Sequence, residues 1–255
     1  MKISIITIAY NNEKDIRPTL ESVINQTYNN IEYIVVDGKS SDKTLDIINE
    51  YSSSITKIIS EPDKGIYDAI NKGIQNATGN VVGLIHAGDR LYDNNVINDI
   101  ASFFKNNDID AIYGQSVIVN ANDRPIRVNK SPSFKKALFR RGWMPSHQSI
   151  YIKRGLFDEL GFYRLDLGSY SDYEFVLRYF YFNDLKVVLL DRFILKFALG
   201  GVSTTNYEEI LMAQKEHRNC WKVNGENPPF YMSCLKVIRK IPQFTLSLFY
   251  RISNK

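Results

Sequence analysis

The sequence predicts an α/β fold in which helices cover both faces of a mostly parallel sheet. Apolar, β-branched segments alternate with segments of helical spacing through the first half of the chain, and a polar cluster follows each predicted strand. Strands that alternate with helices of this length form units whose strands run parallel. The 255 residues, 44% of them hydrophobic, are enough for one large domain with its own core.

The first half contains the regular elements. Strands are predicted over residues 2–9, 31–37, 56–60 and 80–86, and helices over 13–26, from Ser41-Asp42 through Ile48, and over 66–77. The second half is less regular. It predicts strands over 110–119, 124–130 and 147–152, two short strands within 185–199, and helices over 133–141, 170–182, 206–222 and from Pro228 onward. The simplest organisation is one domain, 1–227, with a C-terminal extension, 228–255.

Composition narrows the classes of function. A net charge of +4 is too mild to indicate nucleic-acid binding. Cys220 and Cys234 lack the spacing of metal ligands, and nothing indicates an oxidising compartment. The apolar run at the N-terminus is too short for a secretion signal, and no segment has the ~20 apolar residues of a membrane span. We therefore expect a cytoplasmic protein.

The polar clusters converge on one edge of the predicted sheet, because the carboxyl ends of parallel strands meet there and form a ligand site. No G-x-G-x-x-G or Walker sequence is present, so lysines or a metal would have to neutralise a diphosphate. Asp37 could accept hydrogen bonds from a nucleobase or ribose, or could only form a turn with Gly38. Lys64, Asn71 and Lys72 flank the next helix, as diphosphate ligands or as solvated side chains.

Two segments carry a family resemblance. "SIITIAYNNEKDIRPTLESVINQTYNNIEYIVVDGKSSDKTLDII" and "DKGIYDAINKGIQNATGNVVGLIHAGDRLY" resemble the inverting nucleotide-sugar glycosyltransferases of family 2, which make bacterial O-antigens, capsules and exopolysaccharides. The resemblance covers about residues 2–205. It implies the GT-A fold, with a nucleotide-sugar half over 1–110 and an acceptor half over 111–227. It also implies a UDP- or GDP-linked sugar donor and a saccharide or lipid-linked saccharide acceptor.

The resemblance implies a donor site, in which Asp37 contacts the base. Asp89 matches the last aspartate of the family's D-x-D-type motif, which binds Mn²⁺ or Mg²⁺ with the sugar diphosphate. This chain departs from the motif, because Ala87 and Gly88 precede Asp89; one carboxylate can still hold Mg²⁺ together with phosphate oxygens and water. His86 would be an extra ligand or a diphosphate donor, or a histidine satisfied by backbone. The remaining donor-site residues that the resemblance implies are Thr7, Ala9, Asn11, Lys64, Asn71, Ala87 and Gly88.

The resemblance places the catalytic base at Asp172, in "YSDYEFVLRYF". An inverting transfer needs a base that removes the proton of the acceptor hydroxyl during attack, which a positioned carboxylate can do. The structural alternative is that Asp172 caps the helix. Glu174 would support Asp172 or would be a partner on the metal side. Arg178, one turn later, could pair with Glu174.

On the acceptor side, Trp143, His147 and Gln148 match the "H-Q" segment of related sugar transferases. The Trp143 ring would stack on a sugar, or would only pack in the core. Residues 198–206, "ALGGVSTTN", resemble the family's flexible acceptor loop, and a lid there would exclude water.

The tail over residues 229–255 carries five Lys and Arg and no acid. It could lie on the inner face of the cytoplasmic membrane, pack on the domain, or form a homodimer contact. The family's Q-x-x-R-W sequence of processive synthases is absent, which favours addition of a single sugar. Two alternatives to carbohydrate transfer remain: transfer of the sugar to polyprenyl phosphate, and a non-catalytic nucleotide-sugar-binding protein.

Overall fold

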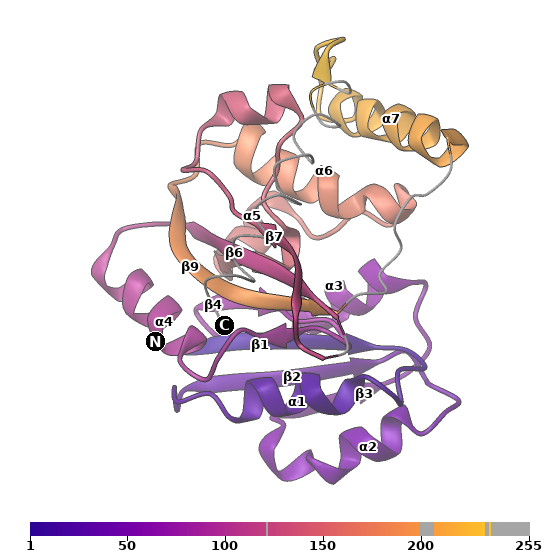
Figure 1. The fold of residues 1–255 in the computed structure, drawn as a ribbon, viewed down its shortest axis with the longest axis vertical. Helices are drawn as coiled ribbons and strands as arrows, with labels where there is room; N and C mark the ends of the chain where they lie inside the picture. Colours follow the sequence, from indigo (N-terminus) through magenta and orange to yellow (C-terminus); the bar gives the residue numbers. More distant parts are fainter. Residues whose placement is uncertain (121, 199–206, 233–234, 236–255) are drawn as a thin grey trace.

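The computed structural model describes residues 1–120, 122–198, 207–232 and 235 of the chain. Within these residues, nine strands form one sheet in the order β3-β2-β1-β4-β8-β6-β9-β5, with β7 paired to β6 (Figure 1). The first four strands run parallel to one another: β1 (Ile3–Ala9), β2 (Ile31–Asp37), β3 (Lys57–Ser60) and β4 (Val81–Leu84). The α/β fold with a parallel nucleus is therefore confirmed.

The second half adds strands of both directions. These are β5 (Arg90–Leu91), β6 (Ala111–Val119), β7 (Pro125–Asn129), β8 (Ile150–Lys153) and β9 (Val187–Ala198). Strand β8 is antiparallel to β4 and β6, whereas β9 runs parallel to β6. The resulting sheet is parallel at its β3–β4 end and mixed beyond it.

Helices cover both faces of the sheet because side chains alternate along each strand. Ile3 and Ile5 pack against α1 (Ile16–Ile24), α2 (Thr44–Glu50) and α4 (Val96–Asn106). Ile6 and Ile8 face the opposite layer, which contains α3 (Ile66–Asn76), α5 (Gly155–Leu160) and α6 (Ser171–Leu177). Figure 1 shows α1 and α2 below β1 and β2, and α6 above them. Helix α7 (Tyr207–Lys222) packs on α6.

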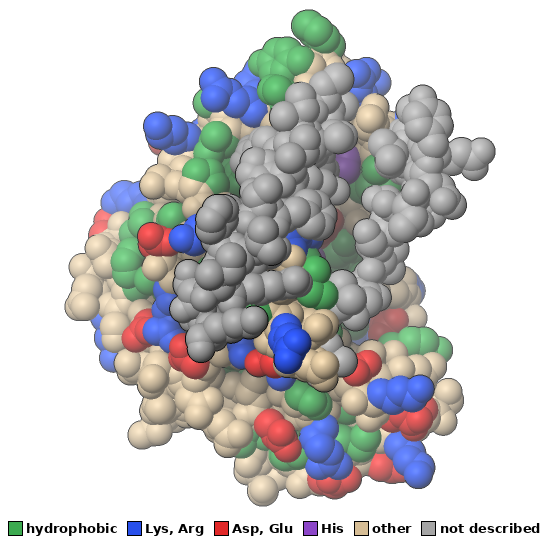
Figure 2. All heavy atoms as spheres, viewed as in Figure 1, with side chains coloured by type: hydrophobic (Ala, Val, Ile, Leu, Met, Phe, Trp, Pro, Cys, Tyr) green, Lys and Arg blue, Asp and Glu red, His purple; other side chains and the backbone are tan. Residues whose placement is uncertain are grey.

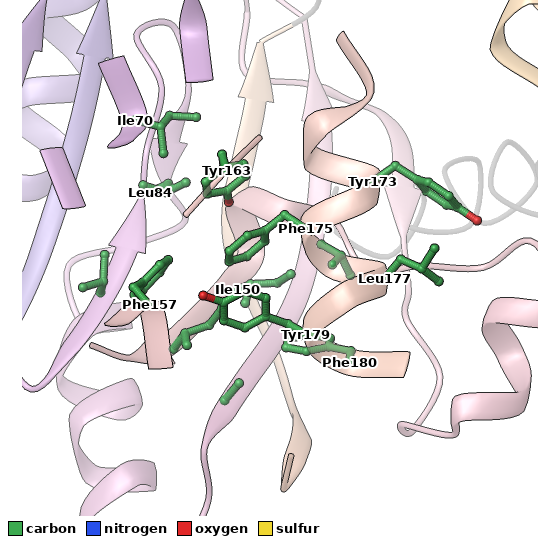
Figure 3. Close-up of a cluster of buried hydrophobic side chains, with 14 of the residues drawn as sticks. Ile70, Leu84, Ile150, Phe157, Tyr163, Tyr173, Phe175, Leu177, Tyr179 and Phe180 are labelled. Carbon is green, nitrogen blue, oxygen red and sulfur yellow. The ribbon is translucent and has the colours of Figure 1, made fainter. Parts of the chain in front are cut away.

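Aromatic rings fill the layer that holds α6. Phe175 stacks on Tyr163 with ring centroids 4.1 Å apart and lies against Phe157 and Tyr179 (Figure 3). Large buried rings dominate core energetics through the area they remove from water. This packing anchors α6 in the layer that also contains α3 and α5.

Three predicted elements differ in the structure. The helix predicted over 133–141 is a 3₁₀ helix, η2 (Lys136–Arg141), that ends at Gly142 with φ 74°. The strand predicted over 147–152 begins with another 3₁₀ turn, η3 (His147–Ser149). The two short strands within 185–199 are one strand, β9. Its register against β6 shifts around Asp191-Arg192, where the ladder is irregular. The polar pair that interrupts the apolar run thus lies in a bulge rather than a turn.

Two helices, α4 and α5, were not predicted. The remaining short elements are η1 (Ser52–Ser54), η4 (Gly168–Tyr170) and a π-helical turn, η5 (Arg178–Phe182), that continues α6. On the face shown in Figure 2, acidic and basic side chains are interspersed around α1, α2 and β3. No helix of the described residues is long and apolar enough to cross a bilayer.

Candidate active site

The carboxyl ends of the parallel strands lie side by side, as predicted. Ala9 is paired with Asp37, and Asp37 with Ser60, so the last residues of β1, β2 and β3 share one edge. The chain after β4 continues along β1, where the Ala87 N–H donates to the carbonyl of Ile8 at 3.1 Å. The edge therefore unites the polar turns that follow β1, β2 and β4.

Asp37 is fully buried at this edge, and serines hold its carboxylate. It accepts hydrogen bonds from the Ser40 hydroxyl at 2.5 Å, the Ser40 N–H at 3.1 Å and the Ser60 hydroxyl at 2.7 Å. A Cβ at Gly38 would lie 2.5 Å from Oδ2 of Asp63, so a larger residue there would displace the Asp63 side chain. The Asp37 carboxylate thus stabilises a turn, which is the structural interpretation of this residue. Asp37 also lies at the carboxyl edge of the sheet.

Tyr10 at this edge was missed by the sequence analysis. Its side chain is 62% exposed, and its ring lies next to the turn at Gly38. An exposed ring beside a fixed carboxylate can stack on a planar ligand such as a nucleobase. Its type alone gave no signal, since tyrosine is common in this chain.

Two residues assigned to the donor site are engaged elsewhere. The Thr7 hydroxyl is buried against the Tyr33 hydroxyl at 3.0 Å, on the face covered by α1 and α2. The Asn71 side chain donates to the Tyr163 carbonyl at 2.8 Å and accepts from the Tyr163 N–H at 3.0 Å. Asn71 therefore clamps the chain before α6, and both side chains have structural partners that the sequence analysis did not foresee.

The other donor-site residues lie at the edge. Ala9 is buried at the end of β1, and Lys64 is exposed in the loop before α3. Asn11 has a left-handed backbone, φ 51°, which asparagine tolerates. Its side-chain oxygen accepts a hydrogen bond from the Ser41 N–H at 2.9 Å. Asn11 thus joins the turns after β1 and β2.

Asp89 ends the turn after β4. Gly88 adopts φ 96°, a conformation that favours glycine, and its N–H donates to the Thr19 hydroxyl at 3.0 Å. The Asp89 carboxylate accepts from the Ala198 N–H at 3.3 Å and from the Gln148 side chain. Burial raises the pKa of Asp89 to about 7, against these hydrogen bonds. A buried carboxylate held by amides rather than by lysine or arginine is suited to receive a cation.

His86 lies two residues before Gly88 in the same turn. Burial, followed by the neighbouring His147, lowers the pKa of His86 to about 3, so the ring is neutral. Its Nδ1 atom is buried without a hydrogen-bond partner among the described residues. The alternative of a backbone-satisfied histidine does not fit this nitrogen, which is free to contact a ligand.

Asp172 lies in the first turn of α6, 26% exposed, and contacts His147. Its Oδ2 is 3.2 Å from His147 Nδ1, and its Oδ1 accepts from the Tyr173 N–H at 2.7 Å. Burial would raise the pKa of Asp172, but His147 and then the Tyr173 N–H lower it below its usual value. The N-cap residue is Tyr170, so Asp172 does not occupy the capping position that the structural alternative required.

Tyr67 is a second residue that the sequence analysis missed. It comes from α3, and its hydroxyl lies against Asp172 and donates to the Ser169 carbonyl at 3.2 Å. Burial, followed by the charge of Asp172, raises the pKa of Tyr67. Tyr67 and Asp172 are far apart in sequence, so no local spacing could have indicated this contact.

The turn η3 joins the two acids of the site. His147 contacts Asp172, and the next residue, Gln148, contacts Asp89. The turn contacts β4, β6, β9 and α6. The carbonyl oxygen of the buried Gln148 side chain has no hydrogen-bond partner among the described residues. The two carboxylates thus flank one polar turn.

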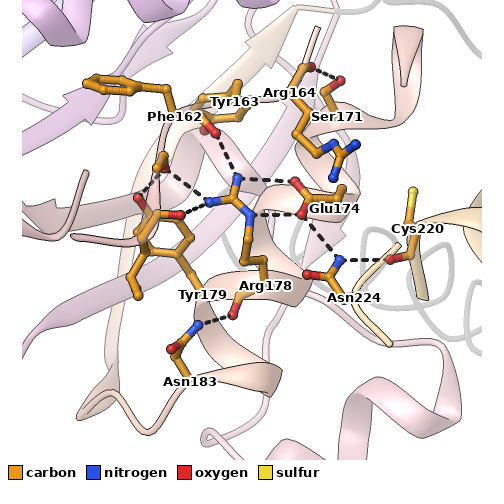
Figure 4. A network of polar contacts seen from close by, with 12 residues as sticks. Phe162, Tyr163, Arg164, Ser171, Glu174, Arg178, Tyr179, Asn183, Cys220 and Asn224 are labelled. Atoms are coloured by element: carbon orange, nitrogen blue, oxygen red, sulfur yellow. Dashed lines mark hydrogen bonds and ion pairs between the residues drawn. The ribbon is translucent and has the colours of Figure 1, made fainter. Parts of the chain in front are cut away.

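Glu174 plays a structural part. Its carboxylate is fully buried and binds the Arg178 guanidinium at 2.8 Å, as the one-turn spacing predicted (Figure 4). Arg178 also donates to the backbone carbonyls of Leu160, Gly161 and Phe162. Glu174 is therefore support for the loop before α6, and the metal-side interpretation of this residue is wrong.

Trp143 does not face an open site. Its ring is 8% exposed and meets Tyr113 and Phe139 edge to face, with centroids 5.6 and 5.8 Å apart. The core-packing interpretation fits this position, and the stacking interpretation does not. Within the described residues, no group of three or more His, Cys, Asp or Glu is arranged to bind a metal.

The predicted acceptor loop and most of the tail lie outside the described residues. Met232, at the start of the tail, is buried, and its sulfur accepts from the Tyr173 hydroxyl at 3.8 Å. Trp221 of α7 donates to the same hydroxyl at 2.8 Å. This first part of the tail packs on α6.

The fold is that of an α/β protein whose candidate site lies at the carboxyl ends of parallel strands, where open α/β sheets bind ligands. The particular family follows from comparison with known sequences: the chain belongs to glycosyl transferase family 2, whose profile matches residues 4–164.

Two relatives from Mycobacterium tuberculosis are similar to the chain. A PGL/p-HBAD biosynthesis glycosyltransferase is 33% identical over 165 residues, which are 63% of this chain and 62% of that protein. An uncharacterized glycosyltransferase is 31% identical over 186 residues, 69% of this chain and 68% of that protein. The chain thus spans less than two thirds of the first relative's length.

Solved structures share the fold. Residues 1–349 of S. aureus TarS, in complex with UDP, give a TM-score of 0.68 at 21% identity, over 86% of this chain and 65% of that one. The mannosyltransferase PcManGT from Pyrobaculum calidifontis, in complex with GDP-Man and Mn²⁺, gives 0.63 at 16% identity, over 100% of this chain and 76% of that one. At these identities the likeness concerns the fold, which agrees with the expected GT-A arrangement.

Proposed function

We propose that the protein transfers one sugar from a UDP- or GDP-linked donor to a hydroxyl of a saccharide or lipid-linked saccharide, with inversion at the anomeric carbon. The observation that carries this proposal is the position of Asp89 and Asp172 on either side of η3, reached through Gln148 and His147. One carboxylate is thus available to the donor and the other to the acceptor. The relatives named as glycosyltransferases support the reaction class.

The donor would lie along the carboxyl edge of β1, β2 and β4. The exposed Tyr10 ring would stack on the base beside Asp37, while Lys64 would approach the diphosphate from its loop. Asp89 would hold Mn²⁺ or Mg²⁺, whose charge stabilises a leaving diphosphate. The residues fit such an ion, since diphosphate oxygens and water can complete a site that has one carboxylate. PcManGT in complex with GDP-Man and Mn²⁺ supports this choice of metal.

Asp172 would act as the general base. As the acceptor oxygen forms its bond to the anomeric carbon, the bond from that carbon to the diphosphate oxygen breaks. The acceptor proton passes to the Asp172 carboxylate, which is ionised at neutral pH and accessible at the surface of the site. Attack from the side opposite the leaving group inverts the configuration. A phosphate acceptor needs no deprotonation, so the polyprenyl phosphate alternative predicts little dependence on Asp172.

A donor and acceptor panel tests the proposal. Purified protein is incubated with UDP-glucose, UDP-galactose, UDP-N-acetylglucosamine or GDP-mannose, with Mn²⁺ and p-nitrophenyl monosaccharides. We expect release of the nucleoside diphosphate and, from an α-linked donor, a β-linked product by ¹H NMR. A product that retains the α-configuration contradicts the mechanism. Donor binding without nucleoside diphosphate release, even to water, contradicts the activity.

A further inference from the structure

Three side chains from separate elements form a hydrogen-bonded row beside the proposed reaction centre. Asp172 Oδ2 lies 3.2 Å from His147 Nδ1, and His147 Nε2 lies 3.3 Å from His86 Nε2. The two imidazole rings are 5.5 Å apart between centroids and inclined by 43°. Asp172 comes from α6, His147 from η3 and His86 from the turn after β4. The row therefore crosses the site from the proposed acceptor side to the proposed donor side.

The carboxylate at one end of the row sets the order of donors and acceptors along it. An ionised carboxylate only accepts hydrogen bonds, so His147 Nδ1 must carry the proton that it shares with Asp172. Two ring nitrogens 3.3 Å apart share one proton, so with Nδ1–H as the only proton of the His147 ring, its Nε2 atom accepts and His86 donates through Nε2–H. The remaining bare nitrogen is His86 Nδ1, which is the atom without a partner among the described residues. Each hydrogen bond of the row thus pairs one donor with one acceptor.

We propose that His147 is a positioning residue for Asp172, that its Nδ1–H holds Oδ2 of the base, and that His86 fixes the His147 tautomer. The catalytic part of this inference rests on the proposed function. His147 contacts Oδ2 and the Tyr173 N–H donates to Oδ1, so both oxygens of the carboxylate are held in one orientation. Its remaining lone pairs keep one direction toward the acceptor. His147 itself does not receive the proton, because its Nε2 atom is occupied by His86.

The charges around Asp172 predict how its titration responds. Burial would raise the pKa of Asp172, whereas His147 lowers it most strongly among the surrounding groups. The other ionisable groups that act on or face Asp172 are His86, His217, Tyr67, Tyr163 and Cys220. Without the Nδ1–H donor, burial dominates and the pKa of Asp172 rises.

Two variants of His147 separate its two contacts. In His147→Asn the amide nitrogen occupies the place of Nδ1 and still donates to Asp172. In His147→Gln the amide reaches the place of Nε2, so the contact with His86 remains and the bond to Asp172 is lost. With the donor and acceptor that wild type uses, we expect His147→Gln to lower kcat about 10- to 100-fold. In the dependence of kcat on pH, the acidic limb of His147→Gln should move to higher pH by about one unit. The KM for the donor should not change.

His147→Asn should recover most of the kcat lost in His147→Gln and keep the wild-type acidic limb. If His147→Gln keeps the wild-type kcat and pH profile, the proposal is wrong. Equal losses in both variants with unmoved acidic limbs also overturn it, because they indicate a role that does not pass through the Nδ1–Asp172 bond.

A spectroscopic test does not depend on activity. The chain has three histidines, His86, His147 and His217, so ¹⁵N-histidine labelling gives six ring-nitrogen signals that His→Asn variants can assign. At pH 7.5 we expect a protonated Nδ1 in His147 and a bare Nδ1 in His86, with the His147 signals shifted in Asp172→Ala. A bare Nδ1 in His147 overturns the proposal. Absence of sugar transfer in wild type would contradict the proposed function instead, while leaving this measurement decisive for the histidine row.

Discussion

Glu174 and Arg178 form a buried ion pair one helical turn apart, 2.8 Å between Oε1 and Nε, directly beneath the helix start that carries Asp172. The pair separates the two acids of "SDYEF" by environment. The Glu174 carboxylate is buried and its charge is balanced by Arg178, whereas the Asp172 carboxylate is partly exposed and contacts His147. The same short motif thus supplies a structural anchor and a candidate base.

Replacing Glu174 by Gln should destabilise the protein without a specific effect on donor binding. The change removes the charge that balances the Arg178 guanidinium and leaves it with the neutral amide oxygen and backbone carbonyls as partners, and breaking a buried pair in this way costs about 3–5 kcal/mol. Urea unfolding measures the loss. The matched control is Asp166→Asn, which removes an exposed pair with Arg164 and should change stability by less than about 1 kcal/mol. Equal stabilities of Glu174→Gln and the control would contradict the structural role.

Glu32 makes the stability depend on pH. Burial would raise its pKa, but hydrogen bonds from Ser4 and Thr78 lower that pKa to about 2. Because the folded pKa lies below the unfolded one, this stabilisation is complete above about pH 4.5 and is lost as the pH falls toward 2. Glu32→Gln should therefore cost about 3 kcal/mol at pH 7, with the difference from wild type shrinking below pH 4.5. Glu50→Gln, at an exposed pair with Arg17, is the control and should change stability by less than about 1 kcal/mol.

Asp89→Asn tests the metal site. The amide keeps the shape of the side chain but removes the charge that would hold Mn²⁺, so the increase in melting temperature on adding Mn²⁺ with UDP- or GDP-sugar should disappear. Electron paramagnetic resonance of Mn²⁺ measures ion binding directly and needs no turnover. Asp108→Asn, an exposed acid at the opposite end of the strands, should retain the wild-type response. A full Mn²⁺ response in Asp89→Asn would exclude Asp89 as the ligand.

Much of the parallel nucleus follows from sequence alone, because β1 and β2 are buried apolar runs that end in polar turns. The direction of Thr7 also follows from alternation, since it lies on the same face as Ile3 and Ile5, but the family resemblance had assigned it to the donor site. The contacts of His147, Gln148 and Tyr67 could not be predicted, because they join segments distant in sequence. Strand β9 was divided in two because a bulge leaves the same polar interruption in a sequence as a turn does.

The central claim is that Asp172 is the base of a sugar transfer, and Asp172→Asn tests it most directly. The measurement is the rate of nucleoside diphosphate release in the presence of acceptor, together with the donor dissociation constant. The account predicts a loss of about 100- to 10,000-fold in kcat, with donor affinity within twofold of wild type. An Asp172→Asn variant that transfers sugar at the wild-type rate would contradict it.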